Sequence, residues 1–121
     1  MEFNIVLYTT LTGASPVQEF LKDLKKKDPD EFAIILAGLA KLRLREYHRP
    51  PLSKAIGGDL FELRHIGKLN TRVLYFFMKG QRIIAVHGIR NKGNKIPRAD
   101  LILAESRKED WEKRSKNEKK N

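Results

Sequence analysis

The spacing of hydrophobic residues changes along the chain, and these changes divide it into strands and helices. Apolar and polar side chains alternate over residues 2–9, which is typical of a strand. From Ser15, and again from Asp28, apolar residues recur at i, i+3, i+4 and i+7, which predicts two amphipathic helices. Each of these segments has Pro at the first helical position, and the second extends to about Glu46. Together they predict a helical hairpin.

Strand spacing returns in the middle of the chain. Residues 47–58 contain a Pro-Pro and a Gly-Gly pair and predict a loop. Three strands joined by short turns follow, which favours an antiparallel meander. We expect them at 60–66, 70–78 and 82–89. A basic loop over 90–96 then leads to Pro97, where a final helix begins.

This order of elements predicts an α+β fold. The expected sheet is small, mixed or antiparallel, and covered on one face by the helical hairpin, with the other face free. We expect a single domain over residues 1–112 and a disordered charged tail over 113–121. No apolar run is long enough to span a membrane, and cysteine is absent. The mixed polar and apolar stretch after Met1 leads us to expect no secretory leader. The expected location is the cytoplasm.

The charge of the chain is concentrated in one part of the sequence. The formal net charge is +10, yet residues 1–40 are slightly acidic. Residues 41–98 hold 14 basic and 3 acidic side chains. Such a local excess is typical of a surface that binds a polyanion, so we expect nucleic acid or the ribosome as a partner. The simpler alternative is that exposed strand residues carry this charge without a ligand.

Three segments resemble one known family in order and spacing. Gly58–Arg64 (GDLFELR) is similar to the "dGLyELR" stretch of phage-derived, HigB-like toxins of the RelE/ParE superfamily. Arg72–Phe77 resembles their "yRvlYff" strand, and Val86–Lys92 resembles the start of their ending, "lhgF-KK-x-x-k-x-P … A-x-x-R". The chain departs from this pattern at Ile89, where the family has an aromatic residue, and at Asn91, where it has a second lysine.

The resemblance implies a RelE-like fold and the toxin of a type II toxin–antitoxin system. RelE-like and HigB-like members enter the ribosomal A site and cleave messenger RNA there, so ribosome and message are the implied partners. No metal and no cofactor is implied. A cognate antitoxin, in HigB-like systems often a helix-turn-helix protein, is the third partner, and the oligomeric state stays open. ParE-like relatives instead poison DNA gyrase. An inactive basic RNA-binding module is the other alternative.

Metal-free RNA cleavage needs a base for the 2′-hydroxyl, stabilisation of the charged phosphorane and an acid for the leaving oxygen. Arg72, at the position of the family's strand arginine, is the candidate phosphate clamp, and an ion pair with Glu62 is its structural alternative. Arg90 and Lys92 in the basic loop are further catalytic candidates, unless that loop is merely solvated. His87 is the candidate proton acceptor, or else a hydrogen-bonded residue at the edge of the core.

Four more cations are candidates for RNA binding. Lys95 lies in the basic loop, and Lys54 and Arg49 lie in the proline-rich loop before the sheet, where simple solvation is the alternative. Arg64 is the fourth, but Glu62 shares its strand face by period 2, so these two side chains could pair instead.

Overall fold

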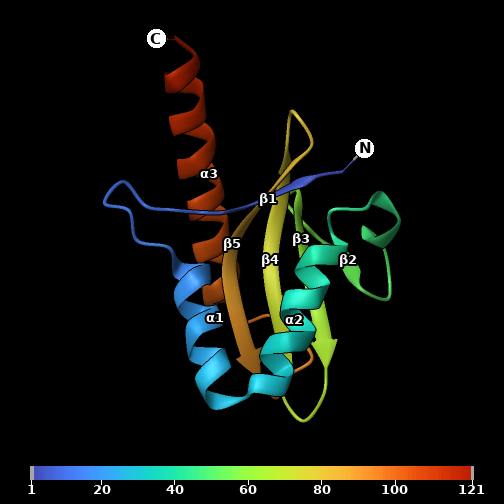
Figure 1. Cartoon of the computed structure of the whole chain (residues 1–121). Coiled ribbons are helices and arrows are strands. Elements are labelled where there is room, and N and C mark those ends of the chain that lie inside the picture. Colours follow the sequence, from blue (N-terminus) through green and yellow to red (C-terminus); the bar gives the residue numbers. More distant parts are fainter. Residues whose placement is uncertain (1, 121) are drawn as a thin grey trace.

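The computed structural model describes residues 2–120, which form one five-stranded sheet and three α-helices (Figure 1). Met1 and Asn121, at the ends of the expected domain and tail, lie outside the described residues. The elements are β1 (Asn4–Leu7), α1 (Pro16–Lys27), α2 (Pro29–Lys41), the 3-10 helix η1 (Arg45–Tyr47), β2 (Ser53–Gly57), β3 (Leu60–Ile66), β4 (Asn70–Met78), β5 (Arg82–Asn91) and α3 (Arg98–Lys120). The predicted α+β class is confirmed.

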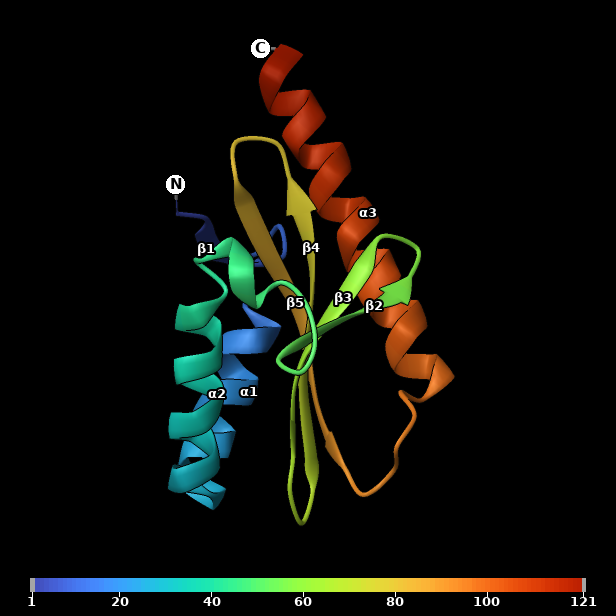
Figure 2. The same cartoon turned by 90° about the vertical axis from the view of Figure 1, so that its right-hand side faces the viewer.

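The sheet is mixed and has helices on both sides. Its strand order is β1-β5-β4-β3-β2, in which β1 runs parallel to β5 and the other neighbours are antiparallel. The α1–α2 pair packs on one face, which we call the hairpin face, and α3 packs on the other, the α3 face (Figure 2). The prediction that helices cover a single face is therefore wrong.

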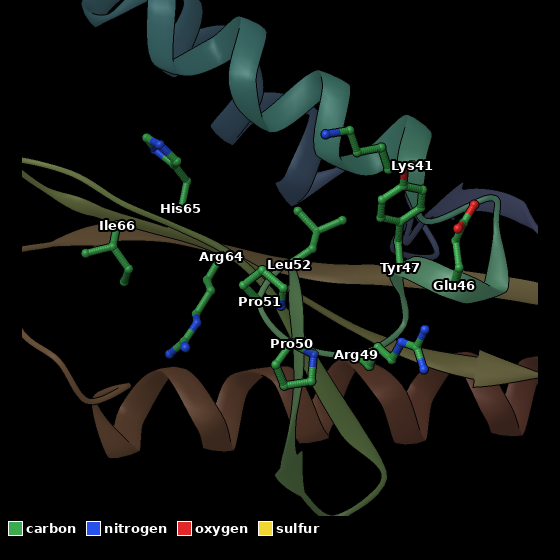
Figure 3. Close-up of a pocket in the computed structure, with 10 residues that line it drawn as sticks. All are labelled: Lys41, Glu46, Tyr47, Arg49, Pro50, Pro51, Leu52, Arg64, His65 and Ile66. Carbon is green, nitrogen blue, oxygen red and sulfur yellow. The ribbon is translucent and has the colours of Figure 1, made fainter.

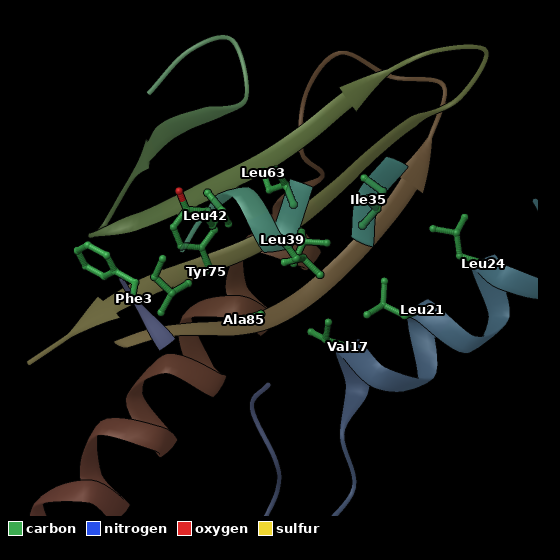
Figure 4. Packing of buried hydrophobic residues seen from close by; sticks show 12 residues of the cluster. Phe3, Val17, Leu21, Leu24, Ile35, Leu39, Leu42, Leu63, Tyr75 and Ala85 are labelled. Atoms are coloured by element: carbon green, nitrogen blue, oxygen red, sulfur yellow. The ribbon is translucent and has the colours of Figure 1, made fainter. Parts of the chain in front are cut away.

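Two hydrophobic clusters, one on each face of the sheet, explain why α3 covers the face opposite the helical hairpin. On the hairpin face, residues of α1 and α2 pack against β3, β4 and β5 (Figure 4). On the α3 face, Ala104 of α3 packs with Leu74, Phe76 and Ile84 of the two central strands. These strands are apolar at successive positions rather than alternate ones, and a strand of that kind needs cover on both sides.

Both predicted helix starts are confirmed, but the second helix is shorter than expected. Asp28 caps α2 by accepting a hydrogen bond from the Glu31 amide. The helix ends at Lys41 instead of continuing to about Glu46. Beyond Lys41 the backbone forms hydrogen bonds of the 3-10 type, in which the amides of Arg43 and Leu44 donate to carbonyls three residues back. The 3-10 helix η1 follows. Leu42 is fully buried at this point and fixes the end of the helix in the core.

The predicted loop over residues 47–58 contains an additional strand, β2. Gly58 and Asp59, which join β2 to β3, have φ values of 60° and 61°. Two successive residues with positive φ are typical of the tight turn of a hairpin. The pairing places Lys54 opposite Glu62, so this strand brings a predicted RNA-binding residue to the sheet.

The final helix reaches Lys120, whereas we expected residues 113–121 to be disordered. Two i,i+4 ion pairs, Lys108–Glu112 and Asp110–Arg114, support this part of the helix. The hydroxyl of Tyr8 also donates a hydrogen bond of 2.7 Å to Asp110, which fastens the helix to the start of the chain. Among the described residues, no helix is long and apolar enough to cross a membrane.

Candidate functional site

Arg72, the candidate phosphate clamp, is enclosed on the α3 face with 2% of its surface exposed. Its Nε lies 3.3 Å from Oε2 of Glu62. Its Nη1 donates to Oδ1 of Asn91 and its Nη2 donates to the carbonyl oxygen of Gly93, each over 3.2 Å. The ion pair that the sequence left as the alternative is therefore present. Every nitrogen of this guanidinium already has a protein oxygen nearby.

The contacts of Arg72 hold the segment that carries Lys92. Asn91 and Gly93 flank this lysine, and Asn70 adds a hydrogen bond of 2.8 Å to the Gly93 carbonyl. Lys92 itself is exposed. A fixed backbone thus presents a solvent-facing ammonium at the end of β5.

The two departures from the family pattern both have structural roles. Asn91 supplies the oxygen that Arg72 binds, which a lysine cannot do because its ammonium is a donor. Ile89 is 7% exposed and belongs to the cluster beneath α3.

A groove of about 370 Å³ opens on the α3 face beside Glu62, and we call it the lysine groove. Lys54 enters it from β2 and Lys95 from the loop before α3, so two predicted RNA-binding residues come together. Its remaining lining is Ala55, Ile56, Asn94, Ile96 and Leu101. The groove therefore combines two cations, an apolar wall and one carboxylate.

The other two predicted RNA-binding residues, Arg49 and Arg64, line a second groove of about 520 Å³ (Figure 3). We call it the proline groove because Pro50 and Pro51 form part of its wall. Figure 3 shows Arg64 pointing away from α2, while the side chain of the next residue, His65, points toward α2. Nη1 of Arg64 lies 3.8 Å from Oε1 of Glu62. Arg64 therefore lies between the proline groove and the lysine groove.

Arg90 lies on the opposite side of the sheet from Arg72. It is paired with Thr71 in the β4–β5 register, and its Nη2 donates to Oδ2 of Asp28 over 2.5 Å. The Glu31 amide, followed by the Arg90 guanidinium, lowers the pKa of Asp28. Arg90 thus joins the helical hairpin to β5 and does not meet the other catalytic candidates.

Both ring nitrogens of His87, the candidate proton acceptor, are engaged. Nδ1 lies 2.8 Å from Nη1 of Arg107, and Nε2 lies 2.7 Å from Oδ1 of Asp100. Because an arginine can only donate, Nδ1 must accept, and Nε2 then carries the proton that it donates to Asp100. His87 therefore joins β5 to the first three turns of α3 and has no free lone pair in this arrangement.

The basic excess of residues 41–98 does not form a single surface. Lys79 and Arg82 flank the β4–β5 turn, at the opposite end of these strands from Lys92. Successive turns of an antiparallel meander alternate between the two ends of the sheet, so cations in turns are necessarily separated. The expectation of one continuous cationic face is wrong.

Sequence reasoning missed the partners that fix the candidate residues. Asp100 was not recognised, and Arg107, which matches the arginine of the family's A-x-x-R ending, was given no role, although their spacing of two helical turns places both on one side of α3. Glu62 was considered as a salt-bridge partner and not as part of a groove, because the strand that forms its other wall was not predicted. Within residues 2–120, no group of three or more His, Cys, Asp or Glu side chains is placed to hold a metal ion.

Comparison with known proteins gives one clear relationship. No curated protein matches the chain significantly. The model of a protein family described as "Phage derived protein Gp49-like (DUF891)" matches residues 19–109, from α1 to the middle of α3. This match covers most of the chain and includes β2 to β5 with both grooves. The chain belongs to this phage-derived Gp49-like family, a toxin-like group related to RelE and HigB.

Proposed function

We propose that this protein is the HigB-like toxin of a type II toxin–antitoxin system and cleaves messenger RNA in the ribosomal A site without a metal ion. Membership of a toxin-like family supports the proposal. The observation that carries it is the arrangement of three cations around two grooves: Lys54 and Lys95 line the lysine groove, and Arg64 lines the proline groove. The proposed place of action is the cytoplasm, where translating ribosomes are found.

The lysine groove suits a bent RNA backbone. Its cations offer charge to phosphate oxygens, and its apolar wall offers a surface for a base. Arg64 adds a planar donor pair of the kind that fits phosphate oxygens. In this proposal Lys92 contributes to holding the message as it leaves the groove. RNA cleavage then proceeds by attack of a 2′-hydroxyl on the adjacent phosphate.

The proposed antitoxin covers the same cations. An acidic or apolar segment, joined in HigB-like systems to a helix-turn-helix domain as the resemblance implies, would occupy the lysine groove and mask Lys92 and Lys95. Neutralisation could equally follow if the bound antitoxin prevents entry into the ribosome. A complex that leaves these lysines exposed and still enters the ribosome would disprove this part of the proposal.

Brief induction of the protein in growing cells tests the function. We expect message ends to appear inside codons and protein synthesis to fall within minutes, while chromosomal DNA stays intact. A double variant, Lys54→Ala with Arg64→Ala, should remove both effects. Broken DNA with intact messages would instead indicate a gyrase poison, and uninterrupted growth would indicate an inactive RNA-binding module.

A further inference from the structure

The proposed cleavage reaction needs a group that takes a proton from the attacking 2′-hydroxyl. His87 cannot do so as it lies, because Nδ1 accepts from Arg107 and Nε2 donates to Asp100. The ring is also joined to α3 rather than directed into the lysine groove, whose lining does not include it. A different acceptor is therefore required near the cations that would bind the phosphate.

Glu62 has the required position. Among the described residues that line the lysine groove, it alone carries a carboxylate. Lys54 lies opposite it on β2, and Arg64 follows it by two residues on the same face of β3. Lys95 completes the groove from the loop before α3. An RNA phosphate bound by these cations would have its neighbouring 2′-hydroxyl within reach of the carboxylate.

Glu62 is also held in a fixed orientation. Only 4% of its side chain is exposed, and Oε2 pairs with the buried Arg72 at 3.3 Å. Oε1 lies on the side of Arg64, 3.8 Å from its Nη1, a distance too long for a direct hydrogen bond. Oε2 is thus anchored to Arg72, while Oε1 is the oxygen to which a hydroxyl in the groove would donate.

We propose that Glu62 is the general base of the reaction; this inference rests on the proposed function. Its carboxylate takes the proton of the 2′-hydroxyl as the 2′-oxygen forms a bond to the adjacent phosphorus. The bond from phosphorus to the 5′-oxygen breaks, and that oxygen takes a proton from water. The products are a 2′,3′-cyclic phosphate and a 5′-hydroxyl end, and Glu62 returns its proton to solvent. Arg72 acts in this scheme as a positioning residue, which holds the carboxylate by its other oxygen.

Three variants of the full chain, assayed for single-turnover cleavage on programmed ribosomes, test this role. Glu62→Gln keeps the shape of the side chain but cannot accept the proton, and its rate at saturation should fall about 100-fold or more. Glu62→Asp keeps a carboxylate that is withdrawn by one methylene, so its rate should lie between those of the wild type and Glu62→Gln. Glu19→Gln, exposed on α1 in the other layer, is the matched control and should cleave like the wild type. Ribosome affinity should stay within about threefold throughout.

The possible outcomes distinguish an error in the role of Glu62 from an error in the proposed nuclease function. A folded Glu62→Gln protein that cleaves within threefold of the wild type, or faster than Glu62→Asp, would overturn the role of Glu62 while leaving the nuclease intact. If Glu62→Gln does not fold, Glu62→Asp decides: a rate at least tenfold lower supports the base, and a rate within threefold overturns it. A wild-type protein that cleaves no message overturns the proposed function, and the inference with it.

Discussion

The side-chain oxygen of Asn91 accepts a hydrogen bond from Nη1 of Arg72 over 3.2 Å. The same guanidinium contacts Glu62 on β3 and the Gly93 carbonyl beyond β5. One buried cation therefore joins two strands and the segment that presents Lys92. The strand arginine and the asparagine that replaces a family lysine are parts of one structural unit.

Arg72→Ala should lower the free energy of unfolding by about 3–5 kcal/mol, because it leaves the buried carboxylate of Glu62 without its nearest cation. Denaturant titration followed by circular dichroism measures the loss. Lys92→Ala is the matched control, because it is exposed in the segment that Arg72 holds, and it should change stability by less than about 0.5 kcal/mol. Equally small losses in both variants would contradict a stabilising role for the ion pair.

Lys54→Ala and Arg64→Ala should each weaken the binding of single-stranded RNA. Each lost phosphate contact should reduce the slope of log affinity against log salt by about 0.7, because fewer counterions are released. Fluorescence anisotropy of a short labelled RNA at several salt concentrations gives the slope. Lys79→Ala, exposed at the far end of β4, should leave it unchanged. An equal decrease in Lys79→Ala would point to general charge rather than to the grooves.

His87→Gln should destabilise the fold by about 1–3 kcal/mol, because it disturbs the hydrogen bonds to Asp100 and Arg107. Message cleavage per folded molecule should stay within threefold of the wild type. Thermal unfolding and ribosome-dependent cleavage are measured on the same preparation, with Ser106→Ala, exposed on α3, as the control. Lost cleavage at unchanged stability would restore His87 as the proton acceptor.

Gly88→Ala should destabilise the protein by about 1–3 kcal/mol. A Cβ at this position would lie 2.3 Å from the ring of Phe20, which packs α1 against β5. Gly67→Ala is the comparison, because its Cβ would meet nothing closer than 3.6 Å. Chemical denaturation of both variants tests the contact. Similar stability in the two would show that α1 can shift away from β5 at little cost.

The pH dependence of stability should report the contact between Asp28 and Arg90. The Glu31 amide, and then Arg90, lower the pKa of Asp28 from its ordinary value of 3.8. A lowered folded-state pKa stabilises the protein above the unfolded value, and this stabilisation is lost as the pH falls through the folded value. Between about pH 4 and pH 2, Tm should therefore fall more steeply in the wild type than in Asp28→Asn. Parallel curves would contradict this assignment.

Much of the fold could be predicted from local patterns. The starts at Ser15 and Asp28 and the central strands follow from spacing and Pro positions, and the structure confirms them. β2 was missed because it has few apolar residues and its stability comes from pairing with β3 rather than from burial. The position of α3 was missed for a related reason, because its apolar stripe is weak and its packing depends on a sheet face that had been expected to remain open.

The candidate site was predictable in composition but not in arrangement. Lys54 and Lys95 were both expected to bind RNA, and they do line one groove. A sequence cannot show that Arg72 is buried against Glu62, because burial of a strand arginine depends on how far the loop after Asn91 folds back. The position of Arg90 follows from the alternation of side chains along a strand. Ile89 lies on the α3 face, so Arg90, the next residue, lies on the hairpin face.

The parallel pair of β1 and β5 also determines when the sheet is completed. Ile5 lies beside Ile83, so the first strand to leave the ribosome pairs with the last. At ordinary rates of synthesis, the nascent β1 waits on the order of ten seconds for its neighbour. The β2–β5 meander can form from local contacts, whereas the edge strand must close a long loop. We therefore expect β1 to be the last strand to join the sheet, although it precedes its neighbours in the chain.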